Sequence, residues 1–203
     1  MQTGSPVQTV RVSVADPSAI GLLGLAMVTL VASSQKLGFT EGTALIIPWA
    51  IFLGACAQLY ASVNDAKIGN TFGATAFGAY GFFWLGVATT WLILNGVFGE
   101  TMLAAADKSQ LGIAFVGYLI FTLFMTYGAA STHKVLFLIF VLIDFLFLGL
   151  AMNVLLHSDF GGLLAGWSEL CISLLSFYAC AASVLNAHYG KVVLPVGSPL
   201  IQR

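Results

Sequence analysis

Long apolar stretches, separated by short polar connections, run through almost the whole chain. A helix needs roughly 20 mostly apolar residues to cross a bilayer, and six stretches are close to that length. They cover residues 19–35, 42–63, 71–94, 111–130, 135–156 and 163–186. None alternates between polar and apolar positions as a barrel strand does, and a helix satisfies its own backbone groups at membrane depth. The pattern therefore predicts an all-α membrane protein with six transmembrane helices.

Composition leads to the same prediction. The 203 residues are 59% apolar and only 7% charged, whereas a soluble domain carries about 25% charged residues. So few charges cannot cover a water-exposed surface, so most of the surface is expected to face hydrocarbon. The net charge of −1 gives no indication of a nucleic-acid partner.

The connections between the apolar stretches are too short to hold a second domain. We expect residues 1–18 to be a cytosolic tail, residues 19–189 a six-helix transmembrane domain and residues 190–203 a second cytosolic tail. An even number of helices places both termini on one side. The cations expected on that side are Arg11, Lys67, Lys134, Lys191 and Arg203, and those on the other are Lys36 and Lys108. This asymmetry predicts cytosolic termini in an inner or plasma membrane.

Two helix entrances on the predicted cytosolic side carry capping residues. Asp16 and Ser18 flank a proline before the first apolar stretch, and Asn70 and Thr71 precede the third. Such residues are ordinary N-caps. The free N–H groups of two helix ends that face one passage would also attract a carboxylate without a permanent cation. Thr75 belongs to a weaker polar set that lines a path or bridges helices.

Two carboxyls lie inside apolar stretches, Asp144 in the fifth and Glu169 in the sixth. Placing a charged Asp at the bilayer centre costs about 2.5–3.5 kcal/mol on insertion scales, so such groups usually face a bundle interior or a watery cavity. Structural hydrogen bonding and a role in proton coupling are both open readings of these two residues.

The residues that carry catalysis or bind metals do not form a recognisable constellation. The histidines lie at predicted helix ends on both faces of the membrane, and the sequence contains neither a nucleophile elbow nor a nucleotide loop. Nothing in the pattern predicts an enzyme, a metal site or a cofactor.

One sequence block narrows the function. Residues 69–84 read GNTFGATAFGAYGFFW, which resembles the signature of the acetate uptake transporter family, the family of the succinate–acetate permeases and of the yeast and bacterial acetate transporters. Residues 16–22, DPSAIGL, resemble its entrance motif Asn-Pro-Ala-Pro-Leu-Gly-Leu. Shorter matches at residues 121–125, 165–167 and 192–197 extend the resemblance over residues 15–197.

The resemblance implies six helices around a pore within each protomer, and a hexameric ring. It implies passage of acetate and related monocarboxylates, with succinate in some members, by a channel or by proton coupling. Aligned on the motifs, the family's narrow apolar neck falls on Leu25, Tyr80 and Ile143. The position that tunes substrate size falls on Ser176.

Departures from the family pattern keep other functions open. Asp16 replaces the usual Asn at the entrance and would repel an anion if ionised, and Asp144 and Glu169 stand where uncharged residues are expected. These carboxyls would suit a cation, so export of ammonia or ammonium is the alternative. A membrane scaffold or sensor and a path for small neutral solutes are further readings. Our leading hypothesis is that Tyr80 and the Asn70 entrance orient a carboxylate while Leu25 and Ile143 form a gate.

Overall fold

The computed structural model describes residues 15–202, and within this range the chain forms helices and no strand. The helices are α1 (Ser18–Lys36), α2 (Ile47–Trp49), the π-helix η1 (Ala50–Ala57), α3 (Gln58–Lys67), α4 (Thr71–Leu94), α5 (Glu100–Ala105), α6 (Lys108–Ala129), α7 (Lys134–Leu156) and α8 (Asp159–Tyr189). Among the described residues, α1, α4, α6, α7 and α8 are long and apolar enough to cross a membrane. The all-α prediction is confirmed.

The second apolar stretch folds differently from the single helix predicted for residues 42–63. Helix α2, η1 and α3 follow one another without a break, so the helical run begins at Ile47 and ends at Lys67. Pro48 in its first turn explains the later start, because proline lacks the N–H that a helix interior needs. The π-helical segment interrupts the regular α-helical hydrogen bonding. The connection at residues 95–110 also differs, since it contains the short helix α5.

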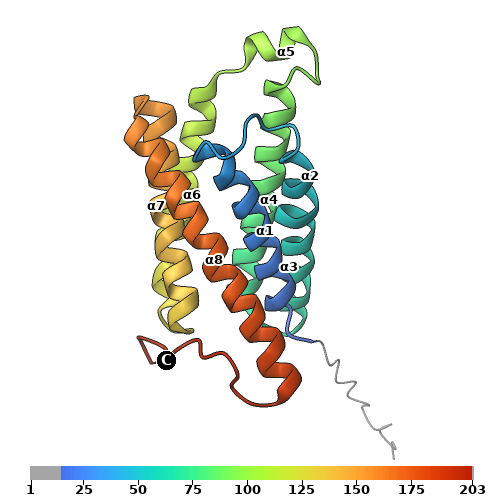
Figure 1. Ribbon diagram of the computed structural model, residues 1–203, viewed down its shortest axis with the longest axis vertical. Helices are drawn as coiled ribbons and strands as arrows, with labels where there is room; N and C mark the ends of the chain where they lie inside the picture. The colour runs from blue at the N-terminus through green and yellow to red at the C-terminus, as the bar shows by residue number, and fades with distance from the viewer. Residues whose placement is uncertain (1–14, 203) are drawn as a thin grey trace, which may run out of the picture.

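The long helices stand side by side in an elongated bundle (Figure 1). Neighbouring pairs close a ring in the order α1, α8, α7, α6, α4, η1–α3 and back to α1. The seam between α4 and α6 is the most open in this ring. Helix α5 lies at one end of the bundle, which we call the α5 end. The chain after α8 lies at the other, which we call the tail end (Figure 1).

Close backbone packing joins α7 to α8. A Cβ atom on Gly149 would lie 2.7 Å from both the backbone N of Ala165 and the backbone O of Gly161. Only glycine permits this approach, because any side chain would enter the neighbouring backbone. The two helices therefore meet without a gap toward the α5 end.

Side-chain caps fix where several helices begin. Asn70 Oδ1 accepts from the Gly73 N–H at 3.2 Å, and the N–H of Ser18 donates to Asp16 Oδ1 at 2.9 Å. His133 Nδ1 accepts from the Leu136 N–H at 3.1 Å. Each cap satisfies a donor that the first turn leaves free.

Residues 191–202, which we call the C-terminal strap, fold back over the tail end of the bundle. Asn186 fastens the strap to α8, because its Oδ1 accepts from the Val193 and Leu194 N–H groups at 2.7 and 3.0 Å. Tyr178 donates its hydroxyl to the Pro195 carbonyl at 2.7 Å. The Val135 N–H donates to the Val196 carbonyl at 3.2 Å, which links the strap to α7. The strap thus bridges α7 and α8.

Candidate substrate pathway

A cavity of about 500 Å³ lies inside the ring at the tail end. Its apolar lining comes mainly from α1, α4, α7 and α8, and Val196 of the strap also lines it. Its polar lining residues are Asp16, Ser18, Gln58, Asn70, Thr132, His133, Ser183 and Asn186. Burial lowers the pKa of His133, which favours the neutral imidazole whose Nδ1 caps α7.

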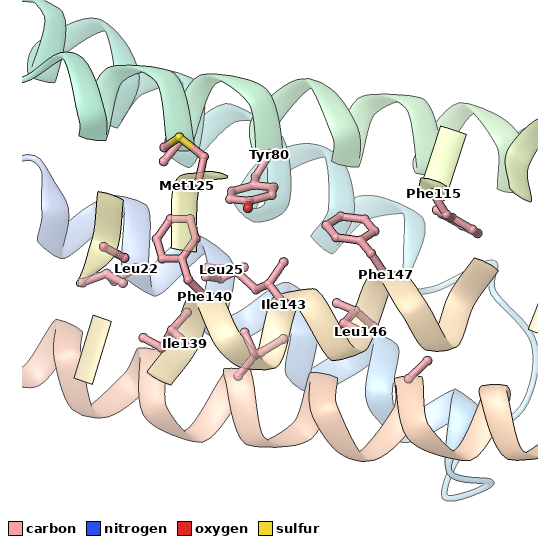
Figure 2. Packing of buried hydrophobic residues seen from close by; sticks show 14 of the residues in the cluster. Leu22, Leu25, Tyr80, Phe115, Met125, Ile139, Phe140, Ile143, Leu146 and Phe147 are labelled. Carbon is pink, nitrogen blue, oxygen red and sulfur yellow. The ribbon is translucent and has the colours of Figure 1, made fainter. Parts of the chain in front are cut away.

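Leu25, Tyr80 and Ile143 close the inner end of this cavity. The same three residues line a second, much smaller void of about 20 Å³ on the α5 side. Their exposed fractions are 8%, 5% and 3%, so the three side chains fill the space between the two cavities. Figure 2 shows them at one level of the bundle, with Phe140 toward the tail end and Phe147 toward the α5 end. The structure therefore brings together the three residues that the family resemblance assigned to a neck.

The hydroxyl of Tyr80 points at α6. It lies 3.0 Å from Thr122 Oγ1, and that Oγ1 donates its own proton to the Tyr118 carbonyl at 2.8 Å. Tyr80 must therefore be the donor to Thr122, which leaves its oxygen as an acceptor. The Tyr80 ring also stacks with Phe147, with centroids 6.4 Å apart. At the neck, Tyr80 therefore offers its aromatic ring and an oxygen lone pair. Its O–H group is already hydrogen-bonded to Thr122.

Gln58 is a second acceptor on the pathway. The side chain is fully buried and lines the large cavity. Its Nε2 donates to the Gly54 carbonyl at 2.8 Å, which fixes the amide orientation, and its Oε1 has no hydrogen-bond partner in the described part of the chain. Leaving a buried acceptor without a hydrogen-bond donor costs free energy. The Gln58 Oε1 atom is therefore suited to accept a hydrogen bond from a ligand that carries an O–H group.

The predicted helix entrances divide into two groups. Asp16, Ser18 and Asn70 line the cavity. Thr71 and Thr75 are exposed on the outer side of α4, where they line a separate surface hollow. The structure therefore does not bring these two threonines to the cavity.

A carboxyl that the sequence analysis passed over supports the Asn70 entrance. Asp65 is 1% exposed, and its Oδ1 accepts from Asn70 Nδ2 at 2.8 Å. Asn70 thereby holds α3 against the first turn of α4. The position of Asp65 in a polar connection of the sequence gave no sign that its side chain is buried. Its contact with Asn70 depends on how the turn between α3 and α4 folds back.

Asp144 and Glu169 line neither cavity. Asp144 Oδ2 accepts from the Thr126 hydroxyl at 2.7 Å, which ties α7 to α6. Glu169 is 2% exposed and forms an ion pair with Lys36, with 2.8 Å between Oε2 and Nζ. This pair joins α8 to the last turn of α1. Each carboxyl thus has a structural partner on a neighbouring helix.

Ser176 lies on α8 behind the neck. Ile172, one turn before it, lines the small void, and Ala179, one turn after it, lines the large cavity. Ser176 is fully buried, and its Oγ has no hydrogen-bond partner among residues 15–202. It sits at the level of the neck without lining either cavity.

A family model described as GPR1/FUN34/yaaH matches residues 1–198. The chain belongs to the GPR1/FUN34/yaaH family. This confirms the resemblance inferred from the motif at residues 69–84. The chain is also 33% identical, over 183 residues, to the succinate-acetate/proton symporter SatP of Escherichia coli strain K12, covering 90% of this chain and 95% of that protein.

Two further relatives carry related names. Acetate permease A of Emericella nidulans is 28% identical over 196 residues, which span 90% of this chain and 65% of that protein. The solved structure of the bacterial acetate channel SatP superimposes with a TM-score of 0.84 at 32% identity. That match covers 91% of this chain and the whole of the other. The helical fold of the present chain is therefore that of a solved membrane channel.

Proposed function

We propose that this protein lets acetate and related small monocarboxylates cross the membrane through a path inside one subunit. The observation that carries the proposal is the neck of Leu25, Tyr80 and Ile143, which lines a cavity on each of its two sides. The names of the relatives, a succinate-acetate/proton symporter, an acetate permease and an acetate channel, support this substrate class. They also support transport in place of catalysis.

The lining chemistry fits a molecule that is half apolar. An apolar neck excludes hydrated ions, because removing water from a charge is costly. The methyl group of acetate contacts Leu25 and Ile143 without such a cost. A dicarboxylate needs a second polar cluster within the neck, so we expect succinate to pass less well than acetate.

The two acceptors on the path favour the protonated acid. Gln58 Oε1 and the Tyr80 oxygen each offer a lone pair, and neither atom has a proton to donate toward the path. An ionised carboxylate needs donors, whereas the O–H of a carboxylic acid binds an acceptor. The proposed passage therefore carries a proton together with the acid, and flux should depend on the pH difference.

We propose that the helical run from Ile47 to Lys67 completes six membrane crossings and that both ends of the chain face the cytosol. Within the described residues, Lys67, Lys134 and Lys191 lie toward the tail end, whereas Lys36 and Lys108 lie toward the α5 end. This asymmetry follows the positive-inside rule. Arg11 and Arg203 lie outside the described residues. A hexameric ring in an inner or plasma membrane completes the proposal.

The carboxyls that favoured ammonium do not support it in this fold. Asp144 and Glu169 lie away from both cavities, and each is bound to a partner. Of the three acidic residues that favoured a cation, only Asp16 lines the path.

Flux into liposomes tests the function directly. Purified protein is reconstituted, and uptake of labelled acetate is followed with and without an inward proton gradient. We expect uptake above that of empty liposomes, competition by unlabelled propionate and acceleration by the gradient. Uptake equal to that of empty liposomes, from protein whose folding is verified by circular dichroism, would overturn the proposal. Competition by ammonium and not by propionate would favour the cation.

A further inference from the structure

We propose that the path leaves the neck sideways on the α5 half of the bundle, past the ring of Phe83, into a groove between α4 and α6. This inference rests on the proposed function and names the second gate of the same path. Phe83 is then a specificity-determining residue beyond the neck.

The groove is a large apolar hollow at the most open seam of the ring. Its volume is about 570 Å³, and its walls come from α4, α5 and α6. The charged and amide groups that line it are Asp107, Lys108 and Gln110, at the start of α6. A carboxylic acid on this route finds apolar walls inside and a cation at the rim, where it ionises on meeting water.

The ring of Phe83 separates this groove from the neck. Phe83 lines both the small void behind the neck and the groove. Its ring meets Tyr118 at 4.9 Å between centroids and Phe147 at 5.1 Å. The side chain is only half-buried. In the proposed path, a change of the Phe83 rotamer is the step that opens the small void toward the groove.

The other direction out of the small void is closed. Toward the α5 end, α1 and α8 pack closely, since a Cβ atom on Gly166 would lie 2.9 Å from Leu37 Cδ2 and 3.3 Å from Lys36 Cβ. The Lys36–Glu169 ion pair bridges the same two helices. At Gly149, α7 and α8 touch backbone to backbone. This close packing between α1, α8 and α7 leaves no room for acetic acid, which has four non-hydrogen atoms. The seam between α4 and α6 is therefore the route with space.

Substitutions at Phe83 provide the first test. Phe83→Ala should raise propionate uptake about threefold or more relative to wild type, because the barrier beside the void is removed. Phe83→Trp should lower acetate uptake by a similar factor. Phe124→Ala is the matched control, since that ring is 59% exposed on α6 and lies outside the groove lining. It should leave uptake unchanged.

A thiol test covers the case in which Phe83 variants fold poorly. Cys56, Cys171 and Cys180 are first replaced by Ser, and Thr90→Cys then places a thiol in the groove. A membrane-impermeant methanethiosulfonate, added on both sides, should label this thiol and lower acetate uptake at least threefold. The control, Ile113→Cys, lies on the exposed side of α6 outside the groove, and its modification should leave uptake unchanged.

The outcomes separate the portal from the function itself. Absence of uptake by the wild-type protein overturns the proposed function. Normal wild-type uptake with a Thr90→Cys thiol that reacts without effect, or that never reacts because lipid or a second copy covers the groove, overturns the portal. Wild-type uptake and selectivity in folded Phe83→Ala and Phe83→Trp overturn it as well.

Discussion

Tyr80 donates its hydroxyl proton to Thr122 across 3.0 Å, and through this bond α6 fixes the orientation of a ring that belongs to the neck. Thr122 is fully buried, and its hydroxyl donates a hydrogen bond to the Tyr118 carbonyl. These two consecutive hydrogen bonds fix the orientation of both the Tyr80 and the Thr122 hydroxyl. Tyr80 is thus a rigid wall of the passage, and its orientation depends on α6, which also contacts α4 through the Tyr118 hydroxyl, a donor to the Ala79 carbonyl at 2.9 Å.

Replacing Thr122 by Val tests this relationship. Val keeps the shape but removes the acceptor, so the buried Tyr80 hydroxyl is left unpaired at a cost of about 1–3 kcal/mol. We expect a lower melting temperature for Thr122→Val and a smaller loss for Tyr80→Phe. The double variant should be more stable than the sum of the single losses implies. Thr89→Val is the control, because Thr89 is exposed and bonds only its own helix at Leu85. Additive losses would contradict the bond.

Ile143→Ala tests the neck. Ile143 is 3% exposed and lines both cavities, so its truncation widens the constriction. One or two methylene groups in an apolar pocket discriminate substrates by about tenfold or more, so the ratio of propionate to acetate uptake should rise by about tenfold. Leu138→Ala, at a position 47% exposed on the same helix, should leave the ratio unchanged. An unchanged ratio in Ile143→Ala would remove Ile143 from the gate.

Much of the helical framework could be predicted from the apolar pattern. The stretch predicted at residues 71–94 coincides with α4, because its apolar run begins at the Asn70 cap. The prediction for residues 42–63 was less accurate. The apolar pattern there reveals neither the later helix start at Pro48 nor the π-helical segment that follows. Helix α5 was missed because six residues within a polar connection leave no apolar signature.

The site was predicted in part. The motif resemblance assigned Leu25, Tyr80 and Ile143 to a neck, and the fold places these three residues together. The partners of these and other residues could not be predicted, because spacing does not say which helices become neighbours. Tyr80 and Thr122 are 42 positions apart, and Lys36 and Glu169 are 133 apart. Each pair exists only because the ring closes in one particular order.

The Lys36–Glu169 pair predicts an asymmetric response to mutation. Lys36→Met leaves the Glu169 carboxylate buried without its cation, which typically costs about 3–5 kcal/mol. The double variant Lys36→Met/Glu169→Leu removes both charges and should recover most of the lost stability. Thermal unfolding in detergent micelles measures both. Glu169→Gln should retain proton-driven acetate uptake, because Glu169 lies away from the path. Loss of proton dependence in a folded Glu169→Gln protein would restore the proton-coupling reading.

His133 predicts a pH-dependent component of stability at the tail end. Burial lowers the pKa of His133 from its ordinary 6.5, and its Nδ1 must stay unprotonated to cap α7. Below about pH 6.5 the unfolded chain therefore binds this proton more readily than the folded protein does. The free energy of unfolding should fall as the pH falls from about 7.5 to about 5.5.

His133→Asn isolates this component. Asn is a good N-cap that does not titrate, so α7 keeps its start while the pH response of this position disappears. The melting temperature of wild type should drop more than that of His133→Asn between the two pH values, because all carboxyls are common to both proteins. His133→Ala separates the cap from the charge, since relative to His133→Asn it should be less stable by about 1 kcal/mol at both pH values. Equal drops in wild type and His133→Asn would show that the imidazole takes up its proton equally well in the folded and unfolded chain, and that burial does not hold it neutral.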